Sequence, residues 1–346
     1  MNYLSLNTYL KNTFGEKVYK LAIDGGFSCP NRDGKLGTRG CIFCSGSGSG
    51  DFAASRLLSV TEQIETAKKR VSEKIKDGKY IAYFQAFTNT YAPVSVLRDK
   101  FHEAIQHPDV VAVSIGTRPD CLPDDVLDLL SELNRIKPVW IELGLQTIHE
   151  QTAGFIRRGY ELGVYDNAVY ELKKRGIYVI THVILGLPGE SEEMMLETIK
   201  YVCGLSSHAA AIMACDGIKL QLLHIIKNTD LGILYEYWHK QNTYNTADVA
   251  PNNSNTIYSC DKNMNIPEEL INTGLSADDI FLMRNYECFT LESYVKLIKK
   301  CISIIPDNIA IHRMTGDGDK KTLIAPLWSG DKKRVLNTIN KALSDD

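Results

Sequence analysis

The sequence lacks any segment that would direct the chain into a membrane. Its first residues, MNYLSLNTYLKNTFGEK, contain no apolar stretch of the kind found in signal peptides. No run in the chain reaches the ~18 consecutive apolar residues that a membrane-spanning helix requires. We therefore expect a cytoplasmic protein without membrane contact.

A strong net charge is also missing. The chain has 39 Lys and Arg residues against 42 Asp and Glu residues, which gives a formal net charge of -3. Proteins that bind nucleic acid over a broad surface are usually strongly basic. Any nucleic-acid partner must therefore contact a local basic patch.

A disulfide framework is not indicated either. The nine cysteines are an odd number, scattered over 346 residues without a secretion signal, and this favours reduced thiols. Six of them stand apart from any paired spacing, and we expect these six to be structural. They are Cys121, Cys203, Cys215, Cys260, Cys288 and Cys301.

What the sequence does contain is an alternation of short apolar runs with longer amphipathic stretches. The runs are rich in β-branched and aromatic residues and are too short for helices, which predicts strands buried on both faces. They occupy residues 18–24, 80–87, 110–117, 139–147, 178–189 and 218–226, with helical patterns between them at 61–76, 95–106, 123–135, 164–175 and 191–203. About six β-α units predict an α/β fold with a partial or full barrel, whose chemistry lies at the carboxyl ends of the strands.

The pattern changes after residue 237, which suggests three regions. Residues 1–237 would form the core barrel with an N-terminal lead-in. Residues 240–275 are rich in Asn and lack periodicity, so we expect an inserted loop or lid over 238–285. Residues 286–346 would form a small C-terminal α/β extension that could bind the substrate or RNA. Within it we expect a helix at 291–304, a strand at 309–315 and a helix at 332–343.

Three cysteines follow the first predicted strand in the segment CPNRDGKLGTRGCIFC. Free structural thiols fit poorly, because a loop of Gly, Asp, Arg and Lys offers no apolar pocket. A structural zinc would need a fourth ligand, and the next cysteine, Cys121, lies beyond another predicted strand. A [4Fe–4S] cluster on Cys29, Cys41 and Cys44 would leave one iron open to an exogenous ligand. We favour the cluster.

Several motifs along the chain resemble one family. They include NTYLKNTFGEKVYKLAIDGGFSCPNRDG, FQAFTNTYAP, SIGTRPDCLP, ELGLQTIHEQT, HVILGLPGE and IHRMTGDG. Together they resemble the radical S-adenosylmethionine (SAM) superfamily, and within it the YtqA/YhcC-like branch related to the catalytic subunit of Elongator. The usual family spacing is CxxxCxxC, and the wide first gap here is similar to that branch. The resemblance implies a partial (β/α)6 TIM-like barrel, a [4Fe–4S] cluster and S-adenosylmethionine as cofactors.

The resemblance also implies which side chains hold S-adenosylmethionine. Gln146 is expected near the ribose and Arg158 on the methionine carboxylate, since a guanidinium can bind a carboxylate with two hydrogen bonds. His182 is expected near the ribose or adenine, and Gly186 in a turn that approaches the adenine. The alternatives are a solvated helix charge for Arg158 and a satisfied core histidine for His182.

A second group of expected cofactor contacts lies at the ends of two other strands. Gln85, Thr88 and Asn89 stand where the superfamily commonly binds the methionine amino group, and Thr117 stands on the neighbouring rim. The segment 117–120, with Arg118 and Asp120, could equally form a salt bridge within a turn.

Substrate contacts are expected at the remaining strand ends. The candidates are Lys219, Gln221, His224, Arg313, Thr315 and Asp317, with Trp328 as a platform for a base. Because side chains alternate along a strand, we do not expect Gln221 and His224 both to face the site.

Two basic regions favour a polyanion such as RNA, although solvated helix faces are the alternative. They contain Lys11, Lys17, Lys20, Arg32, Lys35 and Arg39, and Arg313, Lys320, Lys321, Lys332, Lys333, Arg334 and Lys341.

The branch that the chain resembles acts on the wobble uridine of tRNA. The resemblance implies conversion of a carboxymethylaminomethyl group at C5 to aminomethyl, through a 5′-deoxyadenosyl radical. It also implies tRNA and an external electron donor, such as flavodoxin or ferredoxin, as partners. Two alternatives remain: a radical enzyme that acts on a small molecule or peptide, and a non-catalytic, metal-stabilised RNA-binding protein.

Overall fold

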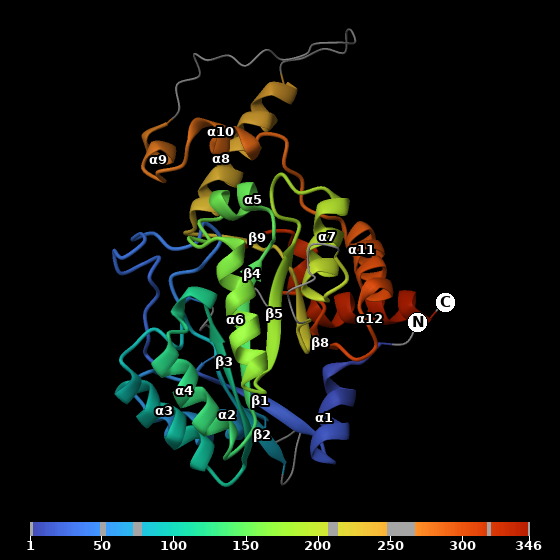
Figure 1. Cartoon of the computed structure of the whole chain (residues 1–346). Helices are drawn as coiled ribbons and strands as arrows, with labels where there is room; N and C mark the ends of the chain where they lie inside the picture. The colour runs from blue at the N-terminus through green and yellow to red at the C-terminus, as the bar shows by residue number, and fades with distance from the viewer. Residues whose placement is uncertain are drawn as a thin grey trace.

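A curled sheet of seven parallel strands forms the centre of the protein (Figure 1). The computed structural model describes residues 3–48, 53–71, 78–206, 214–247, 267–316 and 320–344. The strands lie in the order β1-β2-β3-β4-β5-β6-β8. Their bounds are β1 Val18–Ile23, β2 Lys79–Phe84, β3 Val110–Thr117, β4 Val139–Gln146, β5 Tyr178–Leu185, β6 Gly217–Leu222 and β8 Ala310–Arg313. The sheet is therefore a half-barrel, as the apolar runs predict.

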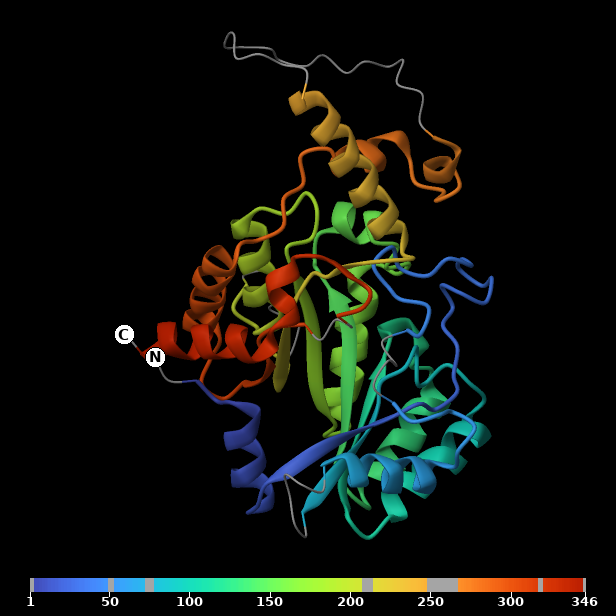
Figure 2. The same ribbon diagram turned by 180° about the vertical axis from the view of Figure 1, so that it is seen from behind.

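Helices cover the outer face of the sheet (Figures 1 and 2). The apolar residues of each helix recur with the helical period and so form one stripe. These stripes pack on the strands, which are buried on both faces, and together they make one large core. These helices are α2 Val60–Val71, α3 Val94–Gln106, α4 Asp124–Asn134, α6 Leu162–Lys174 and α7 Glu192–Val202, with α11 Leu291–Ile304 against α7 and α12 Lys332–Ser344 against α11. Residues 72–76, expected to be helical, lie outside the described residues.

The first helix, α1 Leu6–Phe14, contacts both edge strands of the half-barrel, β1 and β8. The backbone N–H of Ile311 donates to the carbonyl of Leu4 at 2.8 Å, which ties the start of the chain to β8. Leu10 of α1 joins an apolar cluster that includes Val18 and Trp140 near the amino ends of their strands. Thus α1 fills the gap that an open half-barrel leaves between its edges.

The C-terminal extension is built into the barrel wall. Strand β8 is the seventh strand of the main sheet, and β9 Leu323–Ala325 pairs antiparallel with β7 Ile225–Ile226. The single strand expected over 218–226 is therefore two strands, because β6 ends at Leu222 and the chain turns before β7.

Part of the expected loop at 238–285 is helical. Helix α8 Asp230–Ala247 crosses the boundary at 237, and α9 Glu268–Ile271 and α10 Ala277–Leu282 follow. These helices stand together at one end of the molecule, at the top of Figure 1. The Trp238 indole donates to the Ile280 carbonyl at 2.8 Å, which joins α8 to α10. Residues 248–266 lie outside the described part of the chain.

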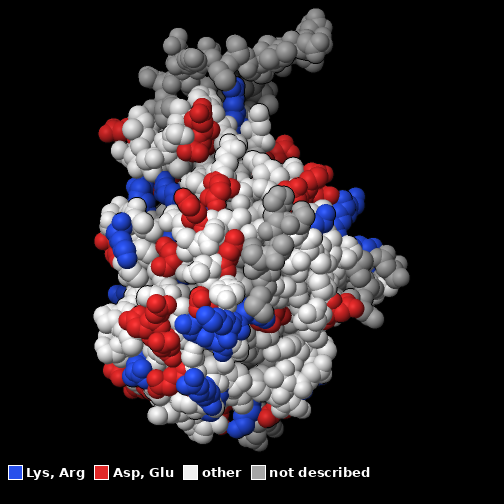
Figure 3. Space-filling view, in the orientation of Figure 1, with Lys and Arg blue, Asp and Glu red and all other residues white. Residues whose placement is uncertain are grey.

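Charges of both signs share the surface. In Figure 3, basic and acidic side chains are interspersed over the visible face, in keeping with the small net charge. Among the described residues, no helix has both the length and the apolar character needed to cross a bilayer.

Candidate active site

A cavity of about 880 Å³ occupies the concave side of the half-barrel. Cys29, Cys41 and Cys44 line it from the loop that follows β1. Side chains from β1, β4, β5, β6 and β8 line its interior. The cysteine segment therefore lies at the carboxyl ends of the strands, where the sequence predicts the chemistry.

The cysteine loop closes on itself, which explains how eleven residues can separate Cys29 from Cys41. The backbone N–H of Gly40 donates to the Asn31 carbonyl at 2.7 Å, so the chain returns to its starting point just before Cys41. The Cys44 N–H then donates to the Cys41 carbonyl at 3.0 Å. The intervening residues form a closed loop that leaves the site and returns to it. The three thiols therefore line the same cavity.

Arg32 fastens the two halves of this loop. Its guanidinium donates to the carbonyls of Cys44, at 3.0 Å, and of Ser45, at 2.7 Å. Gly40 has φ of 78° and lies against the same side chain, since an added Cβ would come within 2.8 Å of Arg32 Nε. Glycine is therefore required at position 40 for both its conformation and its size.

Asn31 supports the central cysteine directly. Its amide Nδ2 lies 3.4 Å from Cys41 Sγ and donates to the Arg157 carbonyl at 2.7 Å. Burial raises the pKa of the Cys41 thiol to about 12, and the neighbouring Cys44 adds to this effect. A thiolate at this position therefore depends on a positive partner such as iron.

The loop is also tied to the helices at the end of the barrel. Asp230, the first residue of α8, accepts hydrogen bonds from the guanidinium groups of Arg39 and Arg157. The Leu231 N–H donates to the Ile42 carbonyl at 2.9 Å. The cysteine loop, the end of α5 Glu150–Phe155 and the start of α8 thus form one hydrogen-bonded unit.

The spacing of the thiols fits a cluster better than a single zinc ion. Four sulfurs around one zinc lie only ~3.8 Å apart, given the Zn–S bond length and tetrahedral geometry. Within the described residues, one group of three ligand-type side chains has all its ligand atoms within 4.8 Å, and that group does not contain the cysteines. Three thiolates that line one cavity are the donor set that holds a [4Fe–4S] cluster and leaves one iron open, so the residues fit that group.

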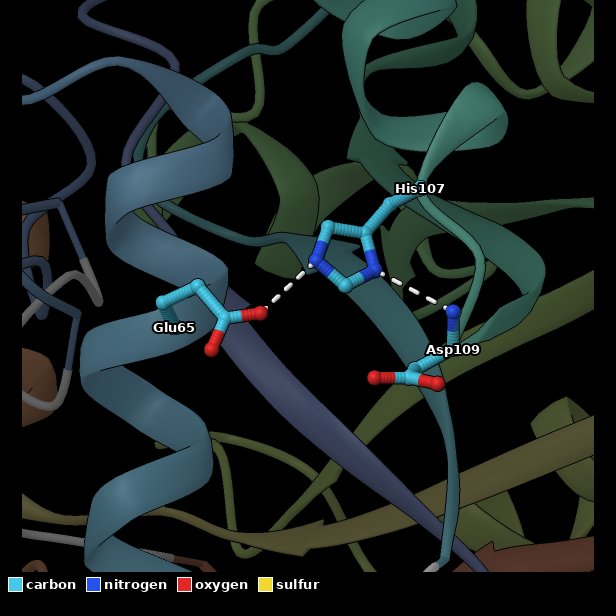
Figure 4. A group of neighbouring side chains, drawn as sticks. All are labelled: Glu65, His107 and Asp109. Carbon is cyan, nitrogen blue, oxygen red and sulfur yellow. Dashed lines mark hydrogen bonds and ion pairs between the residues drawn. The ribbon is translucent and has the colours of Figure 1, made fainter.

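That compact group consists of Glu65, His107 and Asp109, away from the cavity (Figure 4). His107 Nε2 lies 2.9 Å from Glu65 Oε1, and its Nδ1 accepts from the Asp109 N–H at 3.2 Å. The Lys68 ammonium lies 2.7 Å from both carboxylates. Lys79 Nζ also lies 3.8 Å from Asp109, so two lysines balance the two acids and the group is an ion-pair cluster.

Gln146 lines the cavity at the end of β4, as expected. It has φ of 73°, a conformation that costs a non-glycine residue about 1–3 kcal/mol, and the pairing with β5 shifts register here. Its buried Oε1 has no hydrogen-bond partner within the described part of the chain. A strained backbone and an unsatisfied amide oxygen together mark a position that fits a bound ligand.

Arg158 also lines the cavity and is 2% exposed. Its guanidinium donates to the carbonyls of Thr147 and Tyr160 and forms an ion pair with Glu150 at 2.8 Å. The interpretation as a solvated helix charge is therefore wrong. The contacts hold the guanidinium in place, and two of its five N–H groups remain for a carboxylate.

His182 lines the cavity from β5 and contacts a fully buried carboxylate. Its Nε2 lies 2.8 Å from Glu142 Oε2. Burial and the nearby Lys219 ammonium lower the pKa of His182 to about 4. The imidazole is neutral at physiological pH, which supports both the core-residue interpretation and a hydrogen-bonding role toward a ligand.

Of the second group of expected cofactor contacts, three residues line the cavity and one does not. Gln85, Thr88 and Thr117 line the cavity, whereas Asn89 is fully buried behind it. Asn89 donates to the Gly116 carbonyl at 2.8 Å. Arg118 forms the predicted turn salt bridge, with two bonds of 2.8 Å to Asp120.

Two of the expected residues, Gly186 and Trp328, are not among the described residues that line the cavity. The Gly186 carbonyl accepts from the Tyr286 hydroxyl at 2.7 Å, and Phe289 covers its α-carbon, so the chain's own aromatic residues occupy the space beside this turn. Trp328 packs against Tyr294 and donates to the Phe289 carbonyl, so its role as a platform for a base stays a prediction. Asp317 lies outside the described residues.

Lys219, Gln221, His224, Arg313 and Thr315 all line the cavity. The expectation that Gln221 and His224 face opposite sides is wrong. Strand β6 ends at Leu222, so the alternation of a continuous strand no longer applies at position 224.

The largest omission from the expected site is Glu142, in the middle of β4. Its side chain is fully buried and lies 2.6 Å from Lys20 Nζ, and it also forms an ion pair with Lys219. Ser114 donates to the same carboxylate at 2.6 Å. The only signal in the sequence is a charged residue within each of three apolar strands, in VYKLAI, VWIELGLQ and GIKLQL.

Comparison with known proteins shows which family the chain belongs to. The pattern described as the radical SAM superfamily matches residues 35–202, and the radical SAM C-terminal domain matches residues 277–345. YtqA of Bacillus subtilis, an uncharacterized protein, is 44% identical over 343 residues, covering 99% of this chain and 90% of YtqA. The chain belongs to the radical SAM superfamily.

Two more distant similarities agree with this family. A tRNA uridine(34) acetyltransferase of Methanocaldococcus jannaschii is 28% identical over 141 residues, covering 41% of this chain and 24% of the acetyltransferase. The structure of the archaeal Methanocaldococcus infernus Elp3 with an N-terminal deletion has a TM-score of 0.58 and 16% identity, over 94% of this chain and 63% of Elp3. The protein is a radical SAM enzyme that uses a [4Fe–4S] cluster and S-adenosylmethionine, so the non-catalytic alternative is wrong.

Proposed function

We propose that this radical SAM enzyme modifies the C5 substituent of the wobble uridine in tRNA, converting carboxymethylaminomethyl to aminomethyl. The charge of the cavity carries the proposal. Among the described residues that line the cavity, Glu142 is the sole acidic residue. The basic ones are Lys17, Lys20, Arg32, Arg118, Arg158, Lys219, Arg313 and Lys332.

This excess of cations is local, because the whole chain has a net charge of -3. The two basic regions of the sequence meet here: Lys20 and Arg32 come from one, and Arg313 and Lys332 from the other. A cavity with this composition suits a substrate with several negative charges. A polynucleotide satisfies this requirement better than a neutral small molecule or peptide.

The name of one relative supports the position of the modification. The acetyltransferase from M. jannaschii acts, by its name, on uridine 34 of tRNA, and the similarity covers 41% of this chain. We propose that this chain acts on the same nucleoside, uridine 34 of tRNA. We do not propose acetyl transfer for this chain.

When bound, the cluster supplies the electron that splits S-adenosylmethionine and so generates the radical that removes a hydrogen atom from the substrate. The residues of the chain provide the surroundings for this chemistry. Cys29, Cys41 and Cys44 would hold the cluster, and the fixed guanidinium of Arg158 would accept a carboxylate. Gln146 would satisfy its buried Oε1 on the ribose. The neutral imidazole of His182 can orient a ligand without adding charge.

The test is mass spectrometry of nucleosides from tRNA incubated anaerobically with the reconstituted enzyme, S-adenosylmethionine and reduced flavodoxin or ferredoxin. We expect the carboxymethylaminomethyl nucleoside to disappear as the aminomethyl nucleoside forms. An unchanged nucleoside profile, with 5′-deoxyadenosine still released, would direct the search to small-molecule or peptide substrates. The assay uses a cytoplasmic electron donor, in keeping with the expected location.

A further inference from the structure

The interior of the cavity contains more positive than negative charge at its most buried point. Two ammonium groups, those of Lys20 and Lys219, share the single carboxylate of Glu142. The Glu142 side chain is 0% exposed, and those of Lys219 and Lys20 are 5% and 17% exposed. Buried charges are normally balanced by partners of opposite sign, so this group has one positive charge in excess.

The carboxylate of Glu142 is fully used by its neighbours. Oε1 accepts from Lys20 and Ser114, and Oε2 from Lys219 and His182. Each lysine has one further acceptor, Ser114 Oγ at 3.3 Å for Lys20 and the Tyr83 hydroxyl at 3.1 Å for Lys219. Each ammonium has one N–H beyond these acceptors. Besides these bonds, both ammonium groups lie over the Tyr83 ring, 4.9 Å from its centroid for Lys20 and 4.5 Å for Lys219.

Strand β8 and the segment that follows it add three groups to the lining of the cavity. Arg313 is paired in register with Lys219 and lines the cavity. Thr315 Oγ1 and His312 Nδ1 are buried, line the same cavity and have no hydrogen-bond partner among the described residues. Unsatisfied buried polar atoms are uncommon in folded proteins and are explained when a ligand completes their bonds.

We propose that Lys20, Lys219 and Arg313, with Thr315, form a carboxylate-binding site that receives the acidic end of the C5 substituent. The inference rests on the proposed function, which supplies a substrate with a carboxylate and a product without one. The site would therefore distinguish substrate from product by charge.

A phosphate of the RNA backbone is a poorer occupant. The side chains of Lys219 and Glu142 are almost completely buried, and a phosphodiester cannot leave its chain to reach them. The exposed cations Lys17 and Lys332, which also line the cavity, suit backbone phosphates instead. A base that carries an extended acidic group can enter the interior.

The protonation of Lys219 agrees with an unfilled anion site. Burial lowers the pKa of Lys219 to about 7, and Lys20 and Arg313 add to this effect while Glu142 opposes it. A bound carboxylate would restore the charge on Lys219, so binding above pH 7 takes up a proton. The charged and titratable groups around Lys219 are Glu142, Lys20, Arg313, His182, His312 and Tyr83.

The first experiment uses a small probe on the full reconstituted protein. N-methylglycine is compared with its amide, which keeps the ammonium group and lacks the carboxylate, at constant chloride concentration, and thermal unfolding is recorded. We expect the acid to raise the melting temperature at pH 6.5 and its affinity to fall by up to about tenfold per pH unit above pH 7. The effect should disappear in Lys219→Gln and in Arg313→Gln but persist in the matched control Lys332→Gln, which removes one charge from another wall. Equal protection by acid and amide, or full protection of Lys219→Gln, overturns the proposal.

A parallel titration with inorganic phosphate tests the other source of negative charge. Protection by phosphate that requires Lys219, without protection by the acid, would overturn the carboxylate assignment.

The second experiment separates this inference from the proposed function. Turnover is compared for tRNA that carries the carboxymethylaminomethyl group and for tRNA that carries its carboxamide. The native enzyme should prefer the acid by at least about tenfold, and Lys219→Gln should lose that preference. Acid-specific protection with no turnover of either tRNA would remove the proposed function and keep the anion site. Turnover with the same preference in Lys219→Gln would keep the function and remove the site.

Discussion

The two ends of the cavity are built by different means. At the cysteine end, backbone hydrogen bonds and the side chains of Asn31 and Arg32 shape a loop that presents three thiols. In the interior, strands β1, β4 and β6, which are not adjacent in the sheet, bring Lys20, Glu142 and Lys219 into direct contact. The cysteine end thus requires an inorganic group to complete it, whereas the interior is already assembled by the chain.

This difference predicts different responses to mutation. Changes at the cysteine end should remove activity and leave the stability of the fold nearly intact, because the loop lies outside the sheet. Changes in the interior should destabilise the fold, because buried charges depend on one another. The five predictions below test this contrast, from the largest expected effect to the smallest.

Replacement of one thiol, Cys41→Ala, should abolish cleavage of S-adenosylmethionine. Only three thiolates are available, and loss of one leaves two iron atoms of the cluster without a protein ligand. Iron content and 5′-deoxyadenosine release measure the effect. The control is Cys301→Ala, a buried cysteine of α11 outside the cavity, which should retain iron. Equal iron content in the two variants would contradict the assigned ligand set.

Removal of the buried charge, Glu142→Gln, should lower the free energy of unfolding by about 3–5 kcal/mol, because two ammonium groups lose their counter-charge. Urea denaturation of the apoprotein measures this loss. The matched control is Glu132→Gln, whose side chain is 45% exposed beside Arg98 and whose replacement should change the free energy of unfolding far less. Similar losses for the two variants would show that the interior charges are not mutually dependent.

Loss of the amide beside the central thiol, Asn31→Ala, should weaken retention of the cluster by about 10–100-fold with little change in stability. The rate of iron transfer to a chelator provides the measurement. Lys35→Ala, on the exposed part of the same loop, serves as the control. If both variants release iron at the native rate, the contact between Asn31 and Cys41 has no influence on the cluster.

The stability of the interior should depend on pH through His182. Its pKa is lowered from 6.5 to about 4 on folding, so the unfolded chain binds a proton that the folded chain does not bind in this window. Stability should therefore fall as the pH decreases from 6.5 to 4, by on the order of 2 kcal/mol from this residue. His182→Gln should flatten the profile of unfolding free energy against pH relative to the native protein, and His102→Gln on the surface should not.

The smallest effect is expected for Thr315→Val. The buried hydroxyl has no hydrogen-bond partner among the residues that the structure describes, so its removal should change stability by less than about 1 kcal/mol, in the stabilising direction. The same variant should weaken protection by N-methylglycine. Thr338→Val on α12, where the hydroxyl bonds to the Arg334 carbonyl, is the control for stability. A clear loss of stability in Thr315→Val would show that the hydroxyl already has a structural role.

Local pattern predicted most of the barrel. The run at 110–117 coincides with β3, and the helix at 291–304 coincides with α11, because period and burial determine such elements. The pattern does not state which strand lies beside which. The sequence predicts a strand at 309–315 but does not place it. The structure shows that this strand, β8, belongs to the main sheet.

The candidate site shows the same limit. The three thiols were predicted because their spacing is local, whereas Glu142 was missed because its partners Lys20 and Lys219 lie on distant strands. His224 was placed on the wrong face because the end of β6 cannot be read from alternation alone. Contacts between strands, rather than within them, were the unpredictable part.

The bond between Leu4 and Ile311 joins nearly the first and nearly the last segments of the chain. Contacts of such long sequence separation form late, since the loop between them must first be ordered. During synthesis, the wall that α1 and β8 complete cannot exist until residue 311 has left the ribosome. The nascent barrel is thus open along one side until β8 has been synthesised.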